Sequence, residues 1–146
     1  MPVPEAILKT LRSASGSLSA AETTTPVNVS PGHKACVVTL NVTTITTPNA
    51  NDEIDFYLQS CVDTQGTWYD LANVHLTNSD DGATAIKQII VGEPAGSLSN
   101  VTVTSGVIAD NTATTSRGLG HQFRLETKLT GTGNAYAYSA DILLKP

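Results

Sequence analysis

Few side chains in this chain have both the type and the spacing that catalysis or metal binding requires. The three histidines, His33, His75 and His121, are far apart in the sequence and are expected on different elements, so acid–base chemistry is not indicated. A zinc site needs clustered Cys and His, and neither Cys36 nor Cys61 has such a neighbour. The sequence contains no Gly-x-Ser-x-Gly elbow and no Gly-rich phosphate loop ending in Lys-Ser/Thr. We therefore expect no enzyme activity, no cofactor and no metal ion.

Adjacent carboxylates occur at Asp52-Glu53 and at Asp80-Asp81. The run Asn78-Ser79-Asp80-Asp81-Gly82 is rich in oxygen ligands, as a calcium loop is. However, Gln88 stands where the closing Glu of an EF-hand would be. The pattern favours a turn over a calcium site.

Aromatic side chains offer a second kind of chemistry, because they can stack on sugars or fill a core. The candidates are Trp68, Tyr69, Tyr57, Tyr136 and Tyr138. With a single Trp in the chain, we favour the sandwich core or a subunit contact. Trp68 is expected to be largely buried, near Phe56 or Leu58 or beneath a subunit neighbour.

Composition predicts a single β-rich domain that must position these residues. The chain has 146 residues and a mass of 15.2 kDa, of which 14% are charged and 21 are Thr. The net charge of −5 argues against nucleic acid as a partner. No apolar run is long enough to span a membrane and no secretion signal is recognised, so we expect no membrane partner and a protein that is made and used inside a cell, without secretion. In that compartment Cys36 and Cys61 are expected to be free thiols.

Alternating apolar and polar residues predict about eight strands and no long helix. The expected fold is an antiparallel β-sandwich, jelly-roll or immunoglobulin-like. The expected strands are Leu18–Thr25, Lys34–Ile45, Glu53–Val62, Thr67–Leu76, Thr84–Val91, Asn100–Ile108, His121–Thr130 and Asn134–Leu144.

Two pairs of these strands are predicted to form hairpins. In the first, Ile54, Phe56 and Leu58 should face the core, and a turn at 63–66 would place Gly66 at a positive φ. In the second, a Gly-rich loop at 130–134 would join the last two strands.

The N-terminal residues differ from the remainder, and we divide the chain into an arm (1–20) and a sandwich domain (21–146). Residues 4–12 could form two helical turns, and residues 13–17 have linker composition. Ile7, Leu8 and Leu11 are the expected partner-binding residues, because so short a segment could not bury them alone. Deleting residues 1–20 is accordingly expected to leave a folded domain that no longer binds its partner.

The phrase Asp-Thr-Gln-Gly-Thr-Trp-Tyr-Asp at 63–70 resembles one found in small β-sandwich structural proteins of tailed bacteriophages. The resemblance extends to the lead at 17–25, the strand Ala-Cys-Val-Val-Thr-Leu-Asn-Val at 35–42, and the closing pair at 119–125 and 139–143, about two-thirds of the chain. It implies a virion protein of the capsid decoration or cement type, made in the host cytoplasm and located on the capsid surface. It further implies the major capsid protein as partner and a homotrimer as the assembly.

Two other functions remain open from the sequence. One is a tail, neck or fibre component of the virion, which the same sandwich would serve. The other is a carbohydrate-binding module. The loops at 46–52 and 109–120 are further candidate contact segments on any of these hypotheses.

Overall fold

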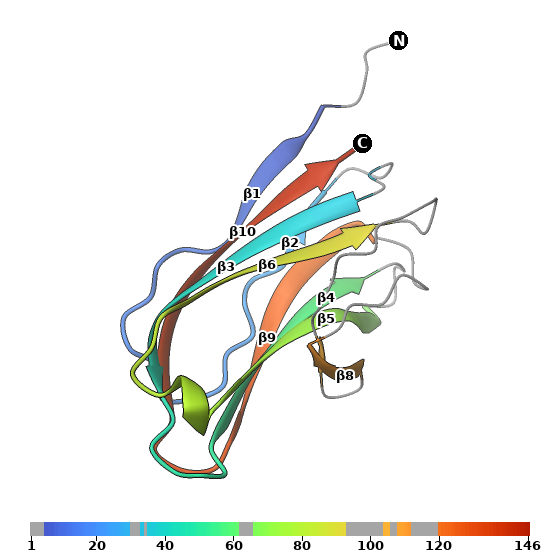
Figure 1. Ribbon diagram of the computed structural model, residues 1–146. Helices are drawn as coiled ribbons and strands as arrows, with labels where there is room; N and C mark the ends of the chain where they lie inside the picture. Colours follow the sequence, from blue (N-terminus) through green and yellow to red (C-terminus); the bar gives the residue numbers. More distant parts are fainter. Residues whose placement is uncertain are drawn as a thin grey trace.

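The computed structural model describes residues 5–29, 33, 35–61, 66–92, 104–105, 108–111 and 120–146. These residues form two four-stranded antiparallel sheets that pack face to face (Figure 1). No α-helix occurs within these ranges. The prediction of an all-β sandwich of about eight strands is therefore confirmed.

Six of the predicted strands agree closely with the structure, whereas the N-terminal residues differ from the prediction. In chain order they are β1 (Ile7–Arg12), β2 (Val27–Asn28), β3 (Ala35–Thr46), β4 (Glu53–Cys61), β5 (Trp68–Thr77), the 3-10 turn η1 (Asn78–Asp80), β6 (Ala85–Gly92), β7 (Thr104–Ser105), β8 (Ile108–Asn111), β9 (Gln122–Thr130) and β10 (Ala135–Lys145). The bounds of β3, β4, β5, β6, β9 and β10 match the predicted ones to within a residue. Most of the strand predicted at 100–108 lies outside the described residues.

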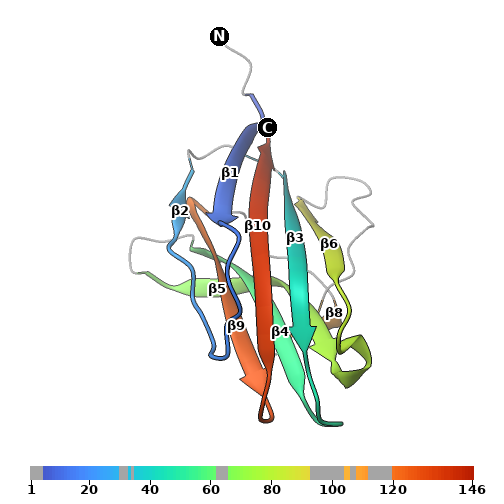
Figure 2. The ribbon, with the colours of Figure 1, turned by 90° about the vertical axis from the view of Figure 1, so that its left-hand side faces the viewer.

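One sheet, called sheet A here, has the strand order β1-β10-β3-β6. Figure 2 looks onto its outer face, with these four strands side by side. The other, sheet B, has the order β2-β9-β4-β5. A third pair, β7 and β8, packs against β5.

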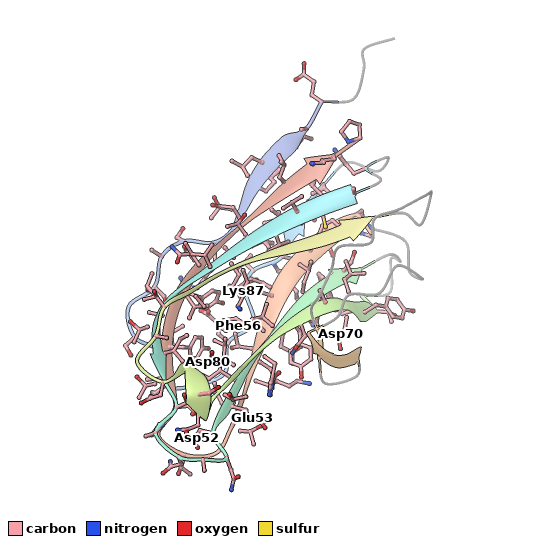
Figure 3. The ribbon with its side chains drawn as sticks, in the orientation of Figure 1. Asp52, Glu53, Phe56, Asp70, Asp80 and Lys87 are labelled. Carbon is pink, nitrogen blue, oxygen red and sulfur yellow. The ribbon has the colours of Figure 1, made fainter. Side chains whose placement is uncertain are left out.

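The core lies between the two sheets and is built from the inward positions of each alternating strand. In β4 these are Ile54, Phe56 and Leu58, all fully buried as predicted; Figure 3 shows Phe56 between the sheets. The ring of Phe56 meets those of Tyr136 and Tyr138 edge-on, at centroid distances of 5.7 and 5.1 Å. This aromatic cluster joins the centre of sheet B to the centre of sheet A.

The N-terminal segment is a strand, and the prediction of two helical turns is wrong. β1 pairs antiparallel with β10, from Ile7 opposite Leu144 to Arg12 opposite Ala140, with a bulge before Arg12. The free edge of β10 supplies backbone partners that an isolated helix of this length would lack, which explains why tertiary context overrides local propensity. Residues 7–12 thus belong to the sandwich and are not an arm outside it.

The segment after β1 carries the chain from one sheet to the other, and the predicted strand at 18–25 does not form. Leu18 makes an isolated bridge with Tyr136 of sheet A, and Thr23 makes one with Glu126 of sheet B. Residues 13–26 therefore form an extended strap along one side of the sandwich, ending in β2. Because the strap bridges to sheet A at Leu18 and to sheet B at Thr23, it does not form one continuous strand.

The loop at 131–134 also connects one sheet to the other, so the predicted second hairpin is wrong. β9 lies in sheet B and β10 in sheet A, and the two are not paired. The connections from β3 to β4 and from β5 to β6 cross between the sheets as well (Figure 1). A Gly-rich loop fits a crossing as well as a hairpin, and sequence alone does not distinguish the two.

Candidate functional site

The outer face of sheet A carries an apolar row across three strands. Leu8 of β1 stands opposite Leu143 of β10, which in turn stands opposite Val37 of β3. Leu143 and Val37 are partly buried, whereas Leu8 is 68% exposed at the edge of the sheet. The next row, Thr10 and Asp141, is polar. An apolar side chain this exposed on an edge strand can contact another molecule directly.

The three predicted partner-binding residues have different positions in the structure. Leu11 is 5% exposed and is part of the sandwich's own core, and Ile7 packs against that core. Leu8 alone of the three presents most of its side chain outward. Leu8 therefore stays a candidate contact residue, while Leu11 and Ile7 contribute to the fold.

A polar network ties the strap to the core on the side next to β1. Glu22 Oε2 accepts hydrogen bonds from Arg12 Nε at 3.0 Å and from the Tyr138 hydroxyl at 2.7 Å. The Tyr136 hydroxyl donates to the Ala20 carbonyl at 2.8 Å and lies 2.7 Å from Thr127 Oγ1. A cleft of about 520 Å³ lies beside this network, between β1 and residues 22–25.

The network shifts the pKa values of its members. Burial by itself would raise the pKa of Glu22, but the hydrogen bonds from Arg12 and Tyr138 outweigh it and hold this pKa below the ordinary value of 4.5. Burial, the hydrogen bond to Glu22 and its charge raise the pKa of Tyr138. The ionised carboxylate is thus the form that the folded state stabilises.

We expect the Glu22 carboxylate to make the stability of the fold depend on pH in the acidic range. Because its folded pKa is lowered, its contribution is complete above the unfolded pKa near 4.5 and is lost as the pH falls through the folded value. Glu22→Gln should therefore reduce the free energy of unfolding at pH 7 by about 1 kcal/mol, and the difference should shrink as the pH falls below 4.5 and through the lowered folded pKa. Urea unfolding at a series of pH values measures this, with Glu5→Gln, an exposed carboxylate ahead of β1, as the control. A difference independent of pH would contradict it.

Most of the paired carboxylates at 52–53 and 80–81 hold the loops that connect the two sheets at one end of the sandwich. Asp52 is 1% exposed and accepts from the backbone N–H groups of Asn49 at 2.8 Å and Thr132 at 3.1 Å. This contact locks the β3–β4 loop against the β9–β10 loop. Gly131, at φ +94°, is required there, because a Cβ would lie 1.9 Å from Asp52 Oδ1. Figure 3 shows Asp52 at this end.

The calcium-like run at 78–82 is a capped turn, as predicted. Thr77 and Asp80 form a capping box around η1, and Asp81 Oδ1 accepts from the Thr47 backbone N–H at 2.7 Å. Gly82 donates its N–H to the Ile45 carbonyl. The Asp80 carboxylate therefore caps its own turn, and the Asp81 carboxylate holds the adjoining β3–β4 connection.

A cluster that sequence reasoning missed lies on the outer face of sheet B. Asp55 Oδ1 is 2.8 Å from His75 Nδ1 and accepts from Asn73 Nδ2 at 2.9 Å. Glu53 completes the cluster: one ligand-type atom from each of Glu53, Asp55 and His75 lies within 4.8 Å of the others. Figure 3 shows Glu53 on the outer side of β4.

A bulge in the β4–β5 hairpin explains why this cluster was not predicted. Near the turn Cys61 pairs with Trp68, and continuing that register would place Val74 opposite Asp55. The irregularity between Leu58 and Gln59 shifts the pairing by one residue, so His75 stands there instead. The single sequence signal was a His and an Asp in adjoining strands of one predicted hairpin.

The outer face of β4 is more buried than the alternating sequence pattern predicts. Asp55, Tyr57 and Gln59 are each less than a tenth exposed. Long side chains of β9 lie over them: Lys128 Nζ is 4.9 Å from the centre of the Tyr57 ring, and Arg124 Nε donates to Gln59 Oε1. This face is thus a packed polar layer, not an open wet surface.

The aromatic residues do not form the sugar platform considered above. Tyr136 and Tyr138 are fully buried in the core, and Tyr57 is 4% exposed. Trp68 is only partly buried, so its predicted burial in the core is wrong; it lies at the start of β5, with the guanidinium of Arg124 4.1 Å from its ring centre. The cation therefore covers one face of the indole.

The three histidines lie on different parts of the fold. His33 precedes β3, His75 lies in β5 and His121 precedes β9. Cys36 and Cys61 are both buried, and neither is part of a disulfide, as predicted. Within the described ranges, no helix is long and apolar enough to cross a membrane.

The geometry places the chain in the class of antiparallel β-sandwich domains. No protein-family model matches the sequence, and no curated protein matches it significantly.

Proposed function

We propose that this chain is a virion structural protein of the capsid decoration or cement type. It binds the phage head and stabilises it by bridging copies of the major capsid protein. The observation that carries this proposal is the apolar row on the outer face of sheet A, with Leu8 68% exposed at its edge. The partner and a homotrimeric assembly are taken from the resemblance to phage β-sandwich proteins.

The distribution of polar groups supports a role in binding and not in turnover. Asp52 and Asp81 lock the loops at one end, and Glu22 holds the strap to the core. These contacts hold the loops and the strap in place, and the outer face of sheet A is then the surface offered for docking. Rigid surfaces lose little conformational entropy on binding, so even a small apolar contact is effective.

Repetition would make a modest contact sufficient on a capsid. Burying Leu8 contributes about 1.5 to 3 kcal/mol per site. When several copies are joined in one oligomer, binding of each copy raises the effective concentration of the others. Weak single contacts then add up to a stable coat.

The test is co-sedimentation of the purified chain with empty capsid shells of the phage that encodes it. Leu8→Asp should weaken binding at least about tenfold, since the lost burial exceeds 1.4 kcal/mol. Ala83→Asp, a matched change at an exposed position in the turn after η1, should bind as the unaltered chain does. Because Leu8 is outside the core, both variants should keep the thermal unfolding midpoint of the parent.

Other results would redirect the proposal. Sedimentation with purified tails but not with shells would assign the chain to the tail, neck or fibre. Retardation on a polysaccharide affinity gel would favour carbohydrate binding. Equal binding of shells by Leu8→Asp and the parent would remove the sheet A surface from the interaction.

A further inference from the structure

We propose that Glu53, Asp55 and His75 bind one divalent transition-metal ion, with Zn²⁺ as the best fit, on the outer face of sheet B. This proposal departs from the expectation from sequence that the chain binds no metal ion. The proposal does not depend on the function proposed above, because the cluster and Leu8 lie on opposite sheets.

The backbone places these three side chains together without any loop. Glu53 and Asp55 are two residues apart in β4, so they share a face of the strand. His75 stands directly opposite Asp55 in β5, in a register fixed by the bulge. Ligands carried by paired strands are held more precisely than ligands on loops.

The donor atoms indicate which metals fit. Two carboxylate oxygens and one imidazole nitrogen suit Zn²⁺ and similar transition metals, whereas Ca²⁺ and Mg²⁺ prefer oxygen ligands throughout. Three protein ligands also leave a fourth tetrahedral position for water or for a donor from another molecule.

The distances are close to those that a metal ion requires. Ligand atoms on one Zn²⁺ lie about 3.0 to 3.4 Å apart. Asp55 Oδ1 and His75 Nδ1 are 2.8 Å apart, and all three ligand-type atoms lie within 4.8 Å of one another. Metal binding would therefore replace the Asp55–His75 hydrogen bond and draw the Glu53 carboxylate inward by a change of rotamer.

A buried amide orients the central ligand. Asn73 is fully buried, and its Nδ2 donates to Asp55 Oδ1 at 2.9 Å. Its own Oδ1 is buried without a hydrogen-bond partner. A buried amide kept at this cost is explained if its role is to fix the Asp55 carboxylate, as residues behind metal ligands commonly do.

The neighbouring cation is drawn away from the cluster. Lys128 of β9 stands opposite Asp55 on its other side, but its ammonium lies 3.9 Å from Glu126 Oε1 and over the Tyr57 ring. Lys128 therefore does not pair with the carboxylates of Glu53 and Asp55. Their negative charge attracts a positive charge, which a divalent ion supplies.

Isothermal titration of the full chain with ZnCl₂ in chelator-treated buffer at pH 7.5 tests the proposal. We expect one Zn²⁺ per chain with a dissociation constant in the micromolar range. Glu53→Gln and His75→Gln should each weaken binding at least tenfold. Asp141→Asn, which removes an exposed carboxylate on sheet A, should leave it unchanged.

Two further measurements keep the test decisive. Thermal unfolding in chelator should give the same midpoint for Glu53→Gln and the parent, which separates loss of a ligand from loss of the fold. Co²⁺ in place of Zn²⁺ should give visible absorption bands that Glu53→Gln abolishes. Absence of binding at 100 µM Zn²⁺, or binding that both ligand variants retain, would overturn the proposal and leave Asp55–His75 as an ordinary polar pair.

Discussion

Replacing Tyr136 by Ala is expected to lower the free energy of unfolding by about 3 to 5 kcal/mol, the range for large-to-small changes in a core. The ring of Tyr136 is fully buried and lies 5.7 Å from each of the Phe56 and Tyr138 rings. Its truncation opens a cavity at the place where the two sheets meet. The hydroxyl would be lost as well, leaving the Ala20 carbonyl without its donor. Equilibrium unfolding in urea, followed by circular dichroism, measures the difference.

Two control variants separate the causes. Tyr136→Phe keeps the ring and removes the hydroxyl, so it should cost about 1 to 2 kcal/mol, the price of a buried hydrogen bond. Leu8→Ala truncates a side chain that is 68% exposed, and should change stability by less than about 0.5 kcal/mol. If Tyr136→Ala and Leu8→Ala had similar effects, the core would not lie where the structure places it.

The period-2 pattern was sufficient to predict the central strands and their inward faces. In β4 the alternation of Ile54, Phe56 and Leu58 identified the core face, and all three are fully buried. In β10 the alternating residues Tyr136, Tyr138 and Ile142 are likewise fully buried, despite a bulge after Ala137. Burial of one face repeats every two residues, so it is visible in a single sequence.

The alternating pattern does not show which strands pair when they are distant in the chain. Residues 7–12 form a strand because the edge of β10, more than 120 residues later, is available to them. The sequence of this segment fits a short helix equally well. The loop at 131–134 shows the same limit, since its residues permit both a hairpin and a crossing between sheets.

The candidate sites depended on single-residue details of register. Leu8 and Leu11 are three residues apart in β1, so they lie on opposite faces of the strand. Leu11 enters the core and Leu8 stays outside, ahead of a bulge between Thr10 and Arg12. In the β4–β5 hairpin another bulge brings His75 opposite Asp55. A one-residue slip changes which side chains meet, and no periodic pattern specifies it.

Removal of residues 1–12 is expected to destabilise the whole domain, contrary to the expectation from sequence that an N-terminal deletion leaves a folded sandwich. The deletion removes the buried Leu11 side chain, the pairing of β1 with β10, and the contact between Arg12 and Glu22. Together these losses amount to on the order of 5 kcal/mol, a large part of the total stability of a domain, which is about 5 to 15 kcal/mol.

The deletion is best judged against a shorter one that spares the strand. Removing residues 1–4 leaves β1 complete, so its unfolding midpoint should match that of the full chain. Removing residues 1–12 should lower the midpoint by roughly 10 to 20 °C, since 1 kcal/mol shifts the midpoint of a domain of about 150 residues by about 2 to 4 °C. It should also expose the edge of β10, and aggregation on heating should increase. A truncated chain that unfolds at the same temperature as the parent would show that β1 is dispensable for folding. Residues 1–12 would then again be candidates for an arm whose order comes from a partner.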